Sequence, residues 1–325
     1  MEVKLKVWRQ NSNNPGNLET YSLEVEPGNT ILDCLNKIKW ELDGSLAYRK
    51  NCRNTICGSC AMRINGRSAL ACKENVEQEI KNYHSTEITI APLGNLPVIK
   101  DLVVDMSKFW HNLEAIEPYV SNESRTVPER EFLQSPQERE QLNQTGNCIM
   151  CGACYSECNS VAVNEEFVGP HALAKSWRWL KDSRDEQTET RLENYNNQES
   201  GVWGCTRCFQ CNYVCPMEVA PMDQISKIKQ EILQREETGS MAIRHRKLLI
   251  NLVKQGGWID ERKFALLLTS NYFRDLKELW KILPVGWKMF RTGKLPKTFE
   301  ASTGTQEVRS LIEAVQATTK SAKGQ

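Results

Sequence analysis

The first part of the chain alternates between apolar and polar positions, as half-buried strands do. Residues 3–7 show this period of two, and residues 21–25 repeat it after a turn at 11–16 that contains Asn, Pro and Gly. Glu87–Ala91 shows the same alternation and is followed by Pro92. We therefore predict two strands joined by a hairpin, and a later strand that closes the same sheet.

A helical period follows the first two strands. Thr30 and Asp33 have the spacing of a reciprocal helix N-cap. The apolar positions that fall on one face of the predicted helix are Ile31, Leu35, Ile38 and Leu42. Asn65-Gly66 then predicts a two-residue hairpin turn. This order of strand, hairpin, strand and helix is typical of the opening of a β-grasp domain.

The middle of the chain changes to a helical period. We predict a helix over 99–116, a polar linker at 121–128 and a helix that begins at Ser135-Pro136. A further helix is predicted over 172–180, and the charged stretch 181–197 is predicted as a surface turn or loop. The fold class is therefore α+β, with a sheet domain before a helical domain.

The last ninety or so residues also follow a helical period. Residues 244–254 predict a basic amphipathic helix that ends at Gly256-Gly257, and Pro284 is predicted to stop a second helical run. Residues 308–315 predict one last short helix before a polar, frayed tail.

Residues 274–297 interleave basic and aromatic side chains. One interpretation is a docking face for a partner subunit or for an anionic membrane surface. The other is a helical cap that packs on the preceding domain and leaves its basic side in water. The two interpretations are compatible, and the pattern does not separate them.

Composition narrows the class of protein. The chain has 325 residues, of which 26% are charged, and its net charge is +1, so nothing predicts nucleic-acid binding. No apolar run approaches the length of a membrane span, and the first residues resemble a strand rather than a targeting peptide. We expect an unexported chain in which thiols stay reduced, so that clustered cysteines act as metal ligands.

The candidate chemistry lies in thirteen cysteines, of which all but Cys34 fall into three groups of four. The first group has the C-x4-C-x2-C…C spacing of plant-type 2Fe–2S sites. Its members are Cys52, Cys57, Cys60 and Cys72. Cys34 stands alone within the predicted helix, either as a small buried apolar residue or, as the alternative, in a ligand or redox role.

The other two groups are copies of one C-x2-C-x2-C-x3-C motif. They are Cys148, Cys151, Cys154 and Cys158, and then Cys205, Cys208, Cys211 and Cys215. This motif is typical of 4Fe–4S clusters, and in two-cluster ferredoxins the fourth cysteine of each motif binds the other cluster. We therefore predict that Cys215 joins Cys148, Cys151 and Cys154, and that Cys158 joins Cys205, Cys208 and Cys211. A structural zinc site is the alternative for each group.

Five segments of the chain resemble the iron–sulfur subunit of succinate dehydrogenase and fumarate reductase. They are Cys-Arg-Asn-Thr-Ile-Cys-Gly-Ser-Cys-Ala at 52–61, Ser-Pro-Gln-Glu-Arg-Glu at 135–140, Gly-Pro-His-Ala-Leu at 169–173, Arg-Trp-Leu-Lys-Asp-Ser-Arg-Asp-Glu at 178–186, and Cys205–Pro216. The resemblance implies an FAD-containing flavoprotein partner that oxidises succinate and a membrane-associated partner that handles quinone. It also implies that electrons enter at the 2Fe–2S cluster and leave through the two later clusters.

The chain departs from this family at the second cysteine motif. Most members have no cysteine at the position of Cys208 and build a 3Fe–4S cluster there, so Cys208 favours a second 4Fe–4S cluster over a 3Fe–4S cluster. The family's quinone pocket uses a Trp and a His where this chain has Val163 and Thr206. These departures resemble the subgroup whose anchor is a cysteine-rich, heterodisulfide-reductase-like subunit.

These patterns together predict a 2Fe–2S β-grasp domain at 1–105, a helical two-cluster domain at 106–235 and a docking extension at 236–325. The predicted function is electron transfer from the FAD subunit of succinate dehydrogenase towards quinone, on the cytoplasmic side of a membrane and held there by partner subunits. Fumarate reduction, thiol/disulfide-linked electron transfer and a zinc-bound structural protein are the alternatives. The four histidines are scattered and no nucleophile motif or P-loop is present, so we expect no substrate site on this chain.

Overall fold

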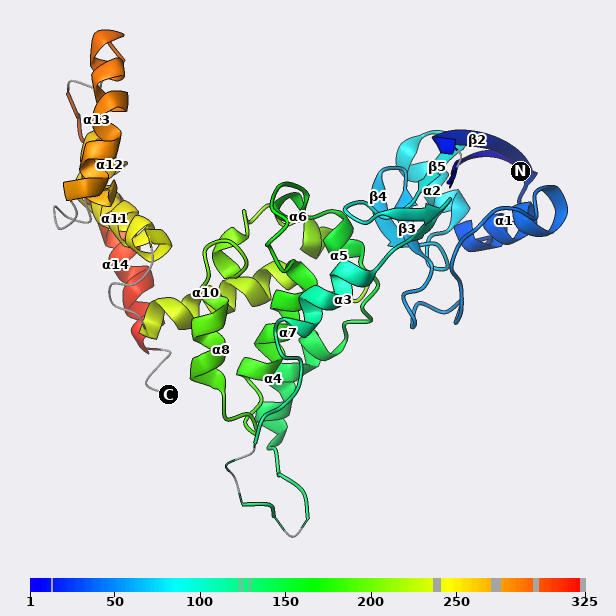
Figure 1. Cartoon of the computed structure of the whole chain (residues 1–325), viewed down its shortest axis with the longest axis horizontal. Coiled ribbons are helices and arrows are strands. Elements are labelled where there is room, and N and C mark those ends of the chain that lie inside the picture. Colours follow the sequence, from blue (N-terminus) through cyan, green and yellow to red (C-terminus); the bar gives the residue numbers. More distant parts are fainter. Residues whose placement is uncertain are drawn as a thin grey trace. The chain divides into compact units, whose positions relative to one another are not determined.

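The computed structural model describes residues 1–12, 14–122, 124, 126–128, 130–235, 241–269, 276–294 and 298–321. The chain forms two compact units, Met1–Ile232 and Leu233–Gln325 (Figure 1). The first unit contains all thirteen cysteines and is described first.

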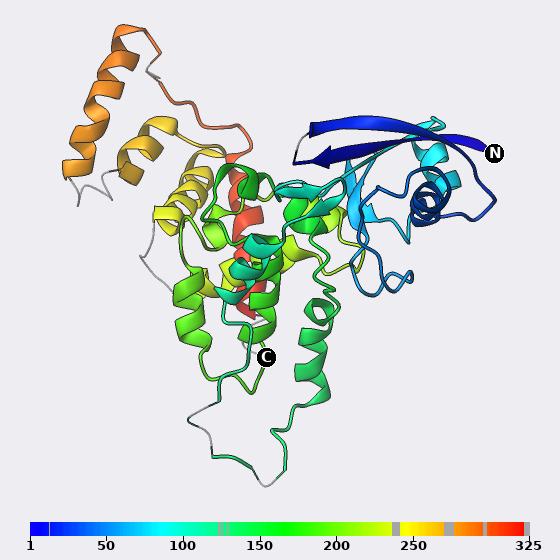
Figure 2. The same ribbon diagram turned by 45° about the vertical axis from the view of Figure 1, so that its right-hand side comes forward.

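A five-stranded sheet forms the N-terminal part of the first unit. Its strands are β1 (Glu2–Asn11), β2 (Asn14–Glu24), β3 (Ala61–Ile64), β4 (Arg67–Leu70) and β5 (Glu87–Ala91). The spatial order is β2-β1-β5-β3-β4, and β1 pairs with β5 in parallel while the other pairs are antiparallel. The long β1–β2 hairpin is drawn in dark blue in Figure 2. β1 ends at Asn11 and β2 begins at Asn14, so both strands extend into the stretch 11–16 that was predicted to be a turn.

The predicted helix forms and then changes its pitch. α1 (Ile31–Lys37) begins with the Thr30–Asp33 capping box, as predicted. A π-helical turn, η1 (Ile38–Leu42), follows it. Ile38 is buried, but Leu42 is exposed, so Leu42 does not share the buried face that it was predicted to form with Ile31, Leu35 and Ile38. A π-turn has more residues per turn than an α-helix, and it therefore rotates Leu42 away from the buried face.

The Asn65-Gly66 hairpin is confirmed. Both residues have left-handed φ, +49° and +81°, and Ile64 pairs with Arg67 across the turn. This is the backbone that a type I′ turn requires. α2 (Val76–Tyr83) then begins at the N-cap Asn75 and leads to β5.

The helix predicted over 99–116 is wrong in its first half. The chain instead forms the short hairpin β6 (Val98–Lys100) and β7 (Val103–Val104), and helix α3 spans only Ser107–Glu114. Asp101 stands at the turn with a left-handed φ of +48°. Its carboxylate accepts hydrogen bonds from the backbone N–H groups of Gln10 (3.0 Å) and Ala47 (2.8 Å). These long-range bonds outweigh the local helical period.

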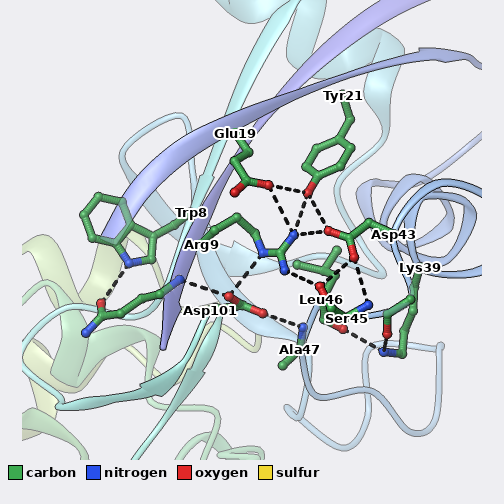
Figure 3. A network of polar contacts seen from close by, with 12 residues as sticks. Trp8, Arg9, Glu19, Tyr21, Lys39, Asp43, Ser45, Leu46, Ala47 and Asp101 are labelled. Carbon is green, nitrogen blue, oxygen red and sulfur yellow. Dashed lines mark hydrogen bonds and ion pairs between the residues drawn. The ribbon is translucent and has the colours of Figure 1, made fainter. Parts of the chain in front are cut away.

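Arg9 joins that hairpin to the rest of the sheet domain (Figure 3). Its guanidinium donates to the carboxylates of Asp101 (3.1 Å) and Asp43, to the Tyr21 hydroxyl (2.6 Å) and to the Ser45 hydroxyl (2.7 Å). Hydrogen bonds from Ser45 and Arg9 hold the pKa of Asp43 well below its usual range. The stabilisation from Asp43 is therefore complete above its unfolded pKa and is lost as the pH falls towards the lowered folded pKa.

The remainder of the first unit is helical. Its elements are α4 (Pro136–Gly146), α5 (Ala153–Ser156), α6 (Asn159–Val163), α7 (Pro170–Leu180), α8 (Thr188–Tyr195), the 3-10 turn η2 (Val202–Gly204), α9 (Gln210–Tyr213) and α10 (Pro221–Arg235). The predicted start of α4 is confirmed, with a capping box formed by Ser135 and Glu138. The helix predicted over 172–180 forms as α7, which begins two residues earlier and ends at Leu180 as predicted.

Residues 181–197 are not the predicted surface loop, because they include α8. Arg191 on this helix is only 1% exposed. Its guanidinium bonds both carboxylate oxygens of Asp185 (3.0 and 3.1 Å) and the backbone carbonyls of Glu117 and Tyr119. The charges of Arg191 and Asp185, which helped to indicate a loop, are thus paired inside the domain, where composition cannot reveal them.

The second unit consists of helices α11 (Met241–Gly256), α12 (Glu261–Thr269), α13 (Leu276–Arg291) and α14 (Thr305–Ser321). The predicted break at Gly256-Gly257 is confirmed. Pro284 was predicted to stop a helix but lies inside α13. It is exposed, so water can hydrate the carbonyl that its missing N–H leaves free.

The last helix is also longer than predicted, because α14 continues to Ser321. Among the described residues, none of the helices combines the length and the apolar composition that crossing a membrane requires.

We predict that Asp101→Ala destabilises the sheet domain by about 3–5 kcal/mol, because it removes a buried charge and leaves two backbone N–H groups without acceptors. Scanning calorimetry of the iron-loaded chain measures the effect as a lower midpoint of thermal unfolding. Glu19→Ala, which removes a half-exposed partner of Arg9, is the control and should cost about 0–1 kcal/mol. Equal losses for the two variants would contradict the role given to Asp101.

Candidate iron–sulfur centres

Cys52, Cys57 and Cys60 of the first group precede β3 on one loop, whose backbone N–H groups point towards the sulfurs, and Cys72 follows β4. The N–H groups of Asn54, Ile56 and Cys57 donate to Sγ of Cys52 at 3.3, 3.4 and 3.3 Å. The N–H of Thr55 donates to Sγ of Cys72 at 3.4 Å. Arg53 and Thr55 adopt left-handed φ values of +58° and +59°, which turn successive N–H groups towards the sulfurs. Such donors stabilise negative charge on sulfur.

The thiols of this group differ in their electrostatics. Burial of Cys57 opposes its ionisation, but hydrogen bonds from Ser59 and from the backbone of Cys52 outweigh burial and lower its pKa to about 6. Burial, together with the neighbouring thiols of Cys72 and Cys57, raises the pKa of Cys60 to about 12. Four thiolates in this space would repel one another unless positive charge lay between them. The donor set therefore fits a 2Fe–2S cluster.

The second group of neighbouring cysteines combines residues from both motifs. Cys148, Cys151, Cys154 and Cys215 line one cavity, together with Phe109, His171 and Pro216. The pKa of Cys151 is raised to about 12, mainly by burial and also by the neighbouring thiols of Cys148 and Cys215. The pKa of Cys154 is also raised, by burial first and then by the neighbouring thiols of Cys151 and Cys148. The structure therefore places Cys215 beside the first three cysteines of the other motif.

The remaining four cysteines form the third group. The pKa of Cys158 is raised, mainly by burial and also by the nearby thiols of Cys205 and Cys208. The pKa of Cys211 is raised to about 12, mainly by burial and also by the thiols of Cys205, Cys158 and Cys208. Buried thiols such as Cys151, Cys154, Cys158 and Cys211 are poor thiolates unless iron compensates their charge, so these two groups of four fit 4Fe–4S clusters by the chemistry of their donors.

The two C-x2-C-x2-C-x3-C motifs also share their backbone conformation. In the first motif Met150 and Gly152 have positive φ values of +54° and +82°, and in the second motif Arg207 and Phe209 have +60° and +63°. The two helical turns, α5 and α9, begin at the same place in each motif. The two motifs are therefore copies of one turn, and they place their cysteines in the same way.

Gly58 brings the sheet domain against the first helical motif. It adopts a φ of +72°, and a Cβ added there would lie 2.9 Å from Cys151 Cβ and 3.0 Å from the Ile149 carbonyl oxygen. The loop that carries Cys57 and Cys60 therefore touches the loop that carries Cys151. Only glycine permits this approach.

The third group reaches the surface at one cysteine. Cys208 is exposed, whereas Cys211 is buried. Phe209, Tyr213 and Val163 are exposed close to these residues in the sequence. Thr206 donates its backbone N–H to the Ser160 hydroxyl at 3.3 Å. The second motif thus presents one of its own cysteines and several apolar side chains to solvent.

His171 was missed by the sequence analysis, which treated the histidines as scattered. It lines the cavity of the second group, lies against Phe109 with ring centroids 3.8 Å apart, and has Nε2 2.9 Å from the Phe109 carbonyl oxygen. Burial lowers its pKa to about 4. Phe109 and His171 are far apart in the chain, so no local signal could have found this pair. Cys34, in contrast, is buried in the core around α1, and burial raises its pKa to about 11.

Within the described part of the chain, no group of three or more Cys, His, Asp or Glu is arranged to hold a single metal ion. The cysteine groups are identified instead by the sulfur hydrogen bonds, the shared cavity and the mutual effects of the thiols. A cluster with several irons needs its sulfurs further apart than one ion does.

Comparison with known families defines the class of protein. Residues 4–111 match the family model of a 2Fe-2S iron-sulfur cluster binding domain, and residues 144–219 match that of a 4Fe-4S dicluster domain. The chain is thus an iron–sulfur protein with a 2Fe–2S domain followed by a 4Fe–4S domain. The prediction of an α+β chain that carries these two cluster types is confirmed, and the type of the third cluster is not.

Similarity to curated proteins gives the family. The chain is 38% identical over 239 residues to succinate dehydrogenase [ubiquinone] iron-sulfur subunit 3, mitochondrial, of Arabidopsis thaliana, with 71% of this chain and 76% of the relative covered. It is also 38% identical over 211 residues to the fumarate reductase iron-sulfur subunit of Escherichia coli O6:H1, with 65% and 84% covered. The chain belongs to the family of iron–sulfur subunits of succinate dehydrogenase and fumarate reductase, which transfer electrons within oxidoreductase complexes.

Solved structures agree with this family. A chain of the Mycobacterium smegmatis Sdh1 complex in the apo form superposes with a TM-score of 0.65 at 27% identity, covering 72% of this chain and 97% of that chain. A hypothetical protein from Helicobacter pylori is similar in fold, with a TM-score of 0.51 at 21% identity over 77% of this chain and 43% of that chain.

We predict that Gly58→Ala weakens the contact between the two cluster-bearing loops. The added methyl group meets Cys151, which costs about 1–3 kcal/mol, and the left-handed backbone adds about 1 kcal/mol. Thermal unfolding and the iron content of the purified chain measure the effect. Gly66→Ala is the matched control, because Gly66 also has positive φ but would place its Cβ in open space. The contact would be ruled out if both variants lost only the smaller amount.

Proposed function

We propose that this chain passes electrons from an FAD-containing succinate dehydrogenase flavoprotein towards quinone, with its cysteines holding three clusters in a row. The observation that carries the proposal is the arrangement of the cysteines, in which each of three groups gathers four thiols and the first two groups meet at Gly58 and Cys151. Iron–sulfur clusters bound at these sites supply one-electron oxidation and reduction.

We assign the ligands by group. Cys52, Cys57, Cys60 and Cys72 hold the 2Fe–2S cluster, Cys148, Cys151, Cys154 and Cys215 hold a 4Fe–4S cluster, and Cys158, Cys205, Cys208 and Cys211 hold the third cluster. The exchange of Cys158 and Cys215 between the motifs is supported by the neighbours of each thiol. The backbone donors around Cys52 orient the first group and stabilise its charge.

We further propose that the third cluster is a second 4Fe–4S cluster. Cys208 supports this assignment, because its thiol lies close enough to Cys158 and Cys211 to raise the pKa of both. A fourth thiolate there completes the ligand set of a cubane, and the exposure of Cys208 makes this the group from which electrons can leave the chain.

The proposed acceptor is a heterodisulfide-reductase-like anchor subunit, with quinone reached indirectly. Val163 and Thr206 stand where the family's quinone pocket has a Trp and a His, and Val163 is exposed. We place the chain at the cytoplasmic side of a membrane, held there by its partners. Fumarate reduction uses the same route in the opposite direction and is the second candidate, which similarity to a fumarate reductase subunit supports.

The proposed domain limits are 1–105 for the 2Fe–2S domain, 106–235 for the helical cluster domain and 236–325 for the extension. The division of the chain after Ile232 supports the second limit. The family models at 4–111 and 144–219 support the order of the first two domains.

We expect Cys208→Ser to convert the third cluster to a 3Fe–4S cluster, with the loss of one iron per chain. Electron paramagnetic resonance of the anaerobically purified, oxidised chain should then gain a 3Fe–4S signal that the unchanged chain lacks. Cys34→Ala, which removes a buried thiol outside the three groups, is the control and should leave the spectrum as it is. A 3Fe–4S signal already present in the unchanged chain would refute the role of Cys208.

Isolation of the complex from its native cells tests the function itself. We expect a flavoprotein to co-purify with this chain and the preparation to reduce a dye when succinate is added. A preparation without flavin, or one that turns over thiols and disulfides but not succinate or fumarate, would overturn the proposed function. The ratio of succinate oxidation to fumarate reduction separates the two candidates.

A further inference from the structure

Helix α13 exposes a continuous apolar stripe. Trp280, Leu283, Trp287 and Phe290 are 73%, 52%, 64% and 61% exposed. They recur at intervals of three and four residues, so all four lie on one side of the helix. We call these four residues the α13 stripe.

The stripe is shaped for a broad apolar contact. Trp287 and Phe290 stack with their ring centroids 5.9 Å apart. A shallow apolar groove runs along the same helix between Leu283, Gly286 and Trp287. A Cβ added at Gly286 would meet no other atom, so this part of the helix surface is open.

Basic side chains lie beside the stripe. Lys277, Lys288, Arg291 and Lys294 are all exposed. Lys277 and Lys288 fall on the flank of the helix next to Trp280 and Trp287 because helical positions advance by about 100° per residue. By sequence, Glu278 is the single acidic residue of α13. The surface thus combines aromatic rings, aliphatic side chains and positive charge.

We propose that α13 lies in the surface of an anionic lipid bilayer, with the α13 stripe in the acyl region and the basic flank at the headgroups. An interfacial helix is built in this way, with Trp and Phe on one side and Lys and Arg on the other. The helix has 16 residues, about 24 Å, which is too short to cross a bilayer, and it carries charges within that length. It therefore lies on the membrane instead of spanning it.

The neighbouring helix α14 shows why lipid fits better than a protein partner. It also exposes two apolar residues, Leu311 and Val315. Glu307, Arg309 and Glu313 mix both signs of charge along α14, as expected of a face in water or against protein. The excess of positive charge and the tryptophans occur together only on α13 among the described helices of this unit. Charge complementarity thus favours phosphate-rich lipid headgroups.

This inference goes beyond the proposed electron-transfer function, because it gives the chain a membrane contact of its own. It holds whether the complex oxidises succinate or reduces fumarate. Its failure would leave the cluster assignments unchanged.

Flotation of the iron-loaded full chain with vesicles tests the proposal. We expect binding to vesicles of phosphatidylcholine mixed with phosphatidylglycerol, and much weaker binding to phosphatidylcholine alone. Each basic residue near an anionic surface strengthens binding roughly five-fold. Lys288→Glu with Arg291→Glu should therefore weaken binding by well over ten-fold, and high salt should reduce the binding of the unchanged chain.

Substitution of the stripe is the sharper test. Trp287→Glu with Phe290→Glu should abolish flotation, whereas the matched change Leu311→Glu with Val315→Glu on α14 should leave it intact. The visible spectrum of the clusters and the far-ultraviolet circular dichroism confirm that each variant is folded. The proposal is overturned by no binding to either vesicle, by binding that survives the α13 change, or by loss of a protein partner as the sole effect of that change.

Discussion

The charge of buried sulfur is the constraint on which the first unit depends. Each of the three cysteine groups brings four thiols together, and burial raises the pKa of at least one thiol in every group. Such groups hold together as ligands only when positive charge lies between the sulfurs, and backbone N–H donors complete the compensation around Cys52. On the proposed ligand sets, Cys158 and Cys215 each cross to the other motif. Neither half of the helical region then has a complete site without the other half, which couples cluster binding to folding.

The contact at Gly58 depends in turn on the sheet domain being held in place. Arg9 ties β1 to the residues after η1 and to the β6–β7 turn through Asp43 and Asp101. Beyond that turn the chain enters α3, where Phe109 stacks on His171 beside the second cysteine group. A polar network in the sheet domain and an aromatic pair beside the second cysteine group thereby hold the two ends of the segment that joins the cluster-bearing regions. The proposed row of clusters follows from these contacts.

Most of the sheet domain could be predicted because its signals are local. The strand alternation, the Thr30 cap and the Asn65-Gly66 turn all depend on neighbouring residues, and all three are confirmed. The errors arose where distant residues decide the structure. Asp101 turns the chain because Gln10 and Ala47 donate to it. One face of α8 is buried because Arg191 bonds Asp185 and the backbone carbonyl of Glu117. Pro284 was wrongly predicted to end a helix, because an exposed helix tolerates a proline. Leu42 was wrongly predicted to share the face of Ile38, because a π-turn changes the helical period.

The sequence by itself determined the three cysteine groups, the cluster types of the first two and the family, because ligand spacing along a chain is a local property. It also showed the 57-residue repeat of the motifs, which the positive φ values at Met150 and Arg207 repeat in the backbone. Only the tertiary structure decided that Gly58 touches Cys151 and that His171 lines a cysteine cavity. It also decided that Cys208 and the α13 stripe are exposed. These features depend on packing between segments far apart in the chain, and no local pattern encodes such contacts.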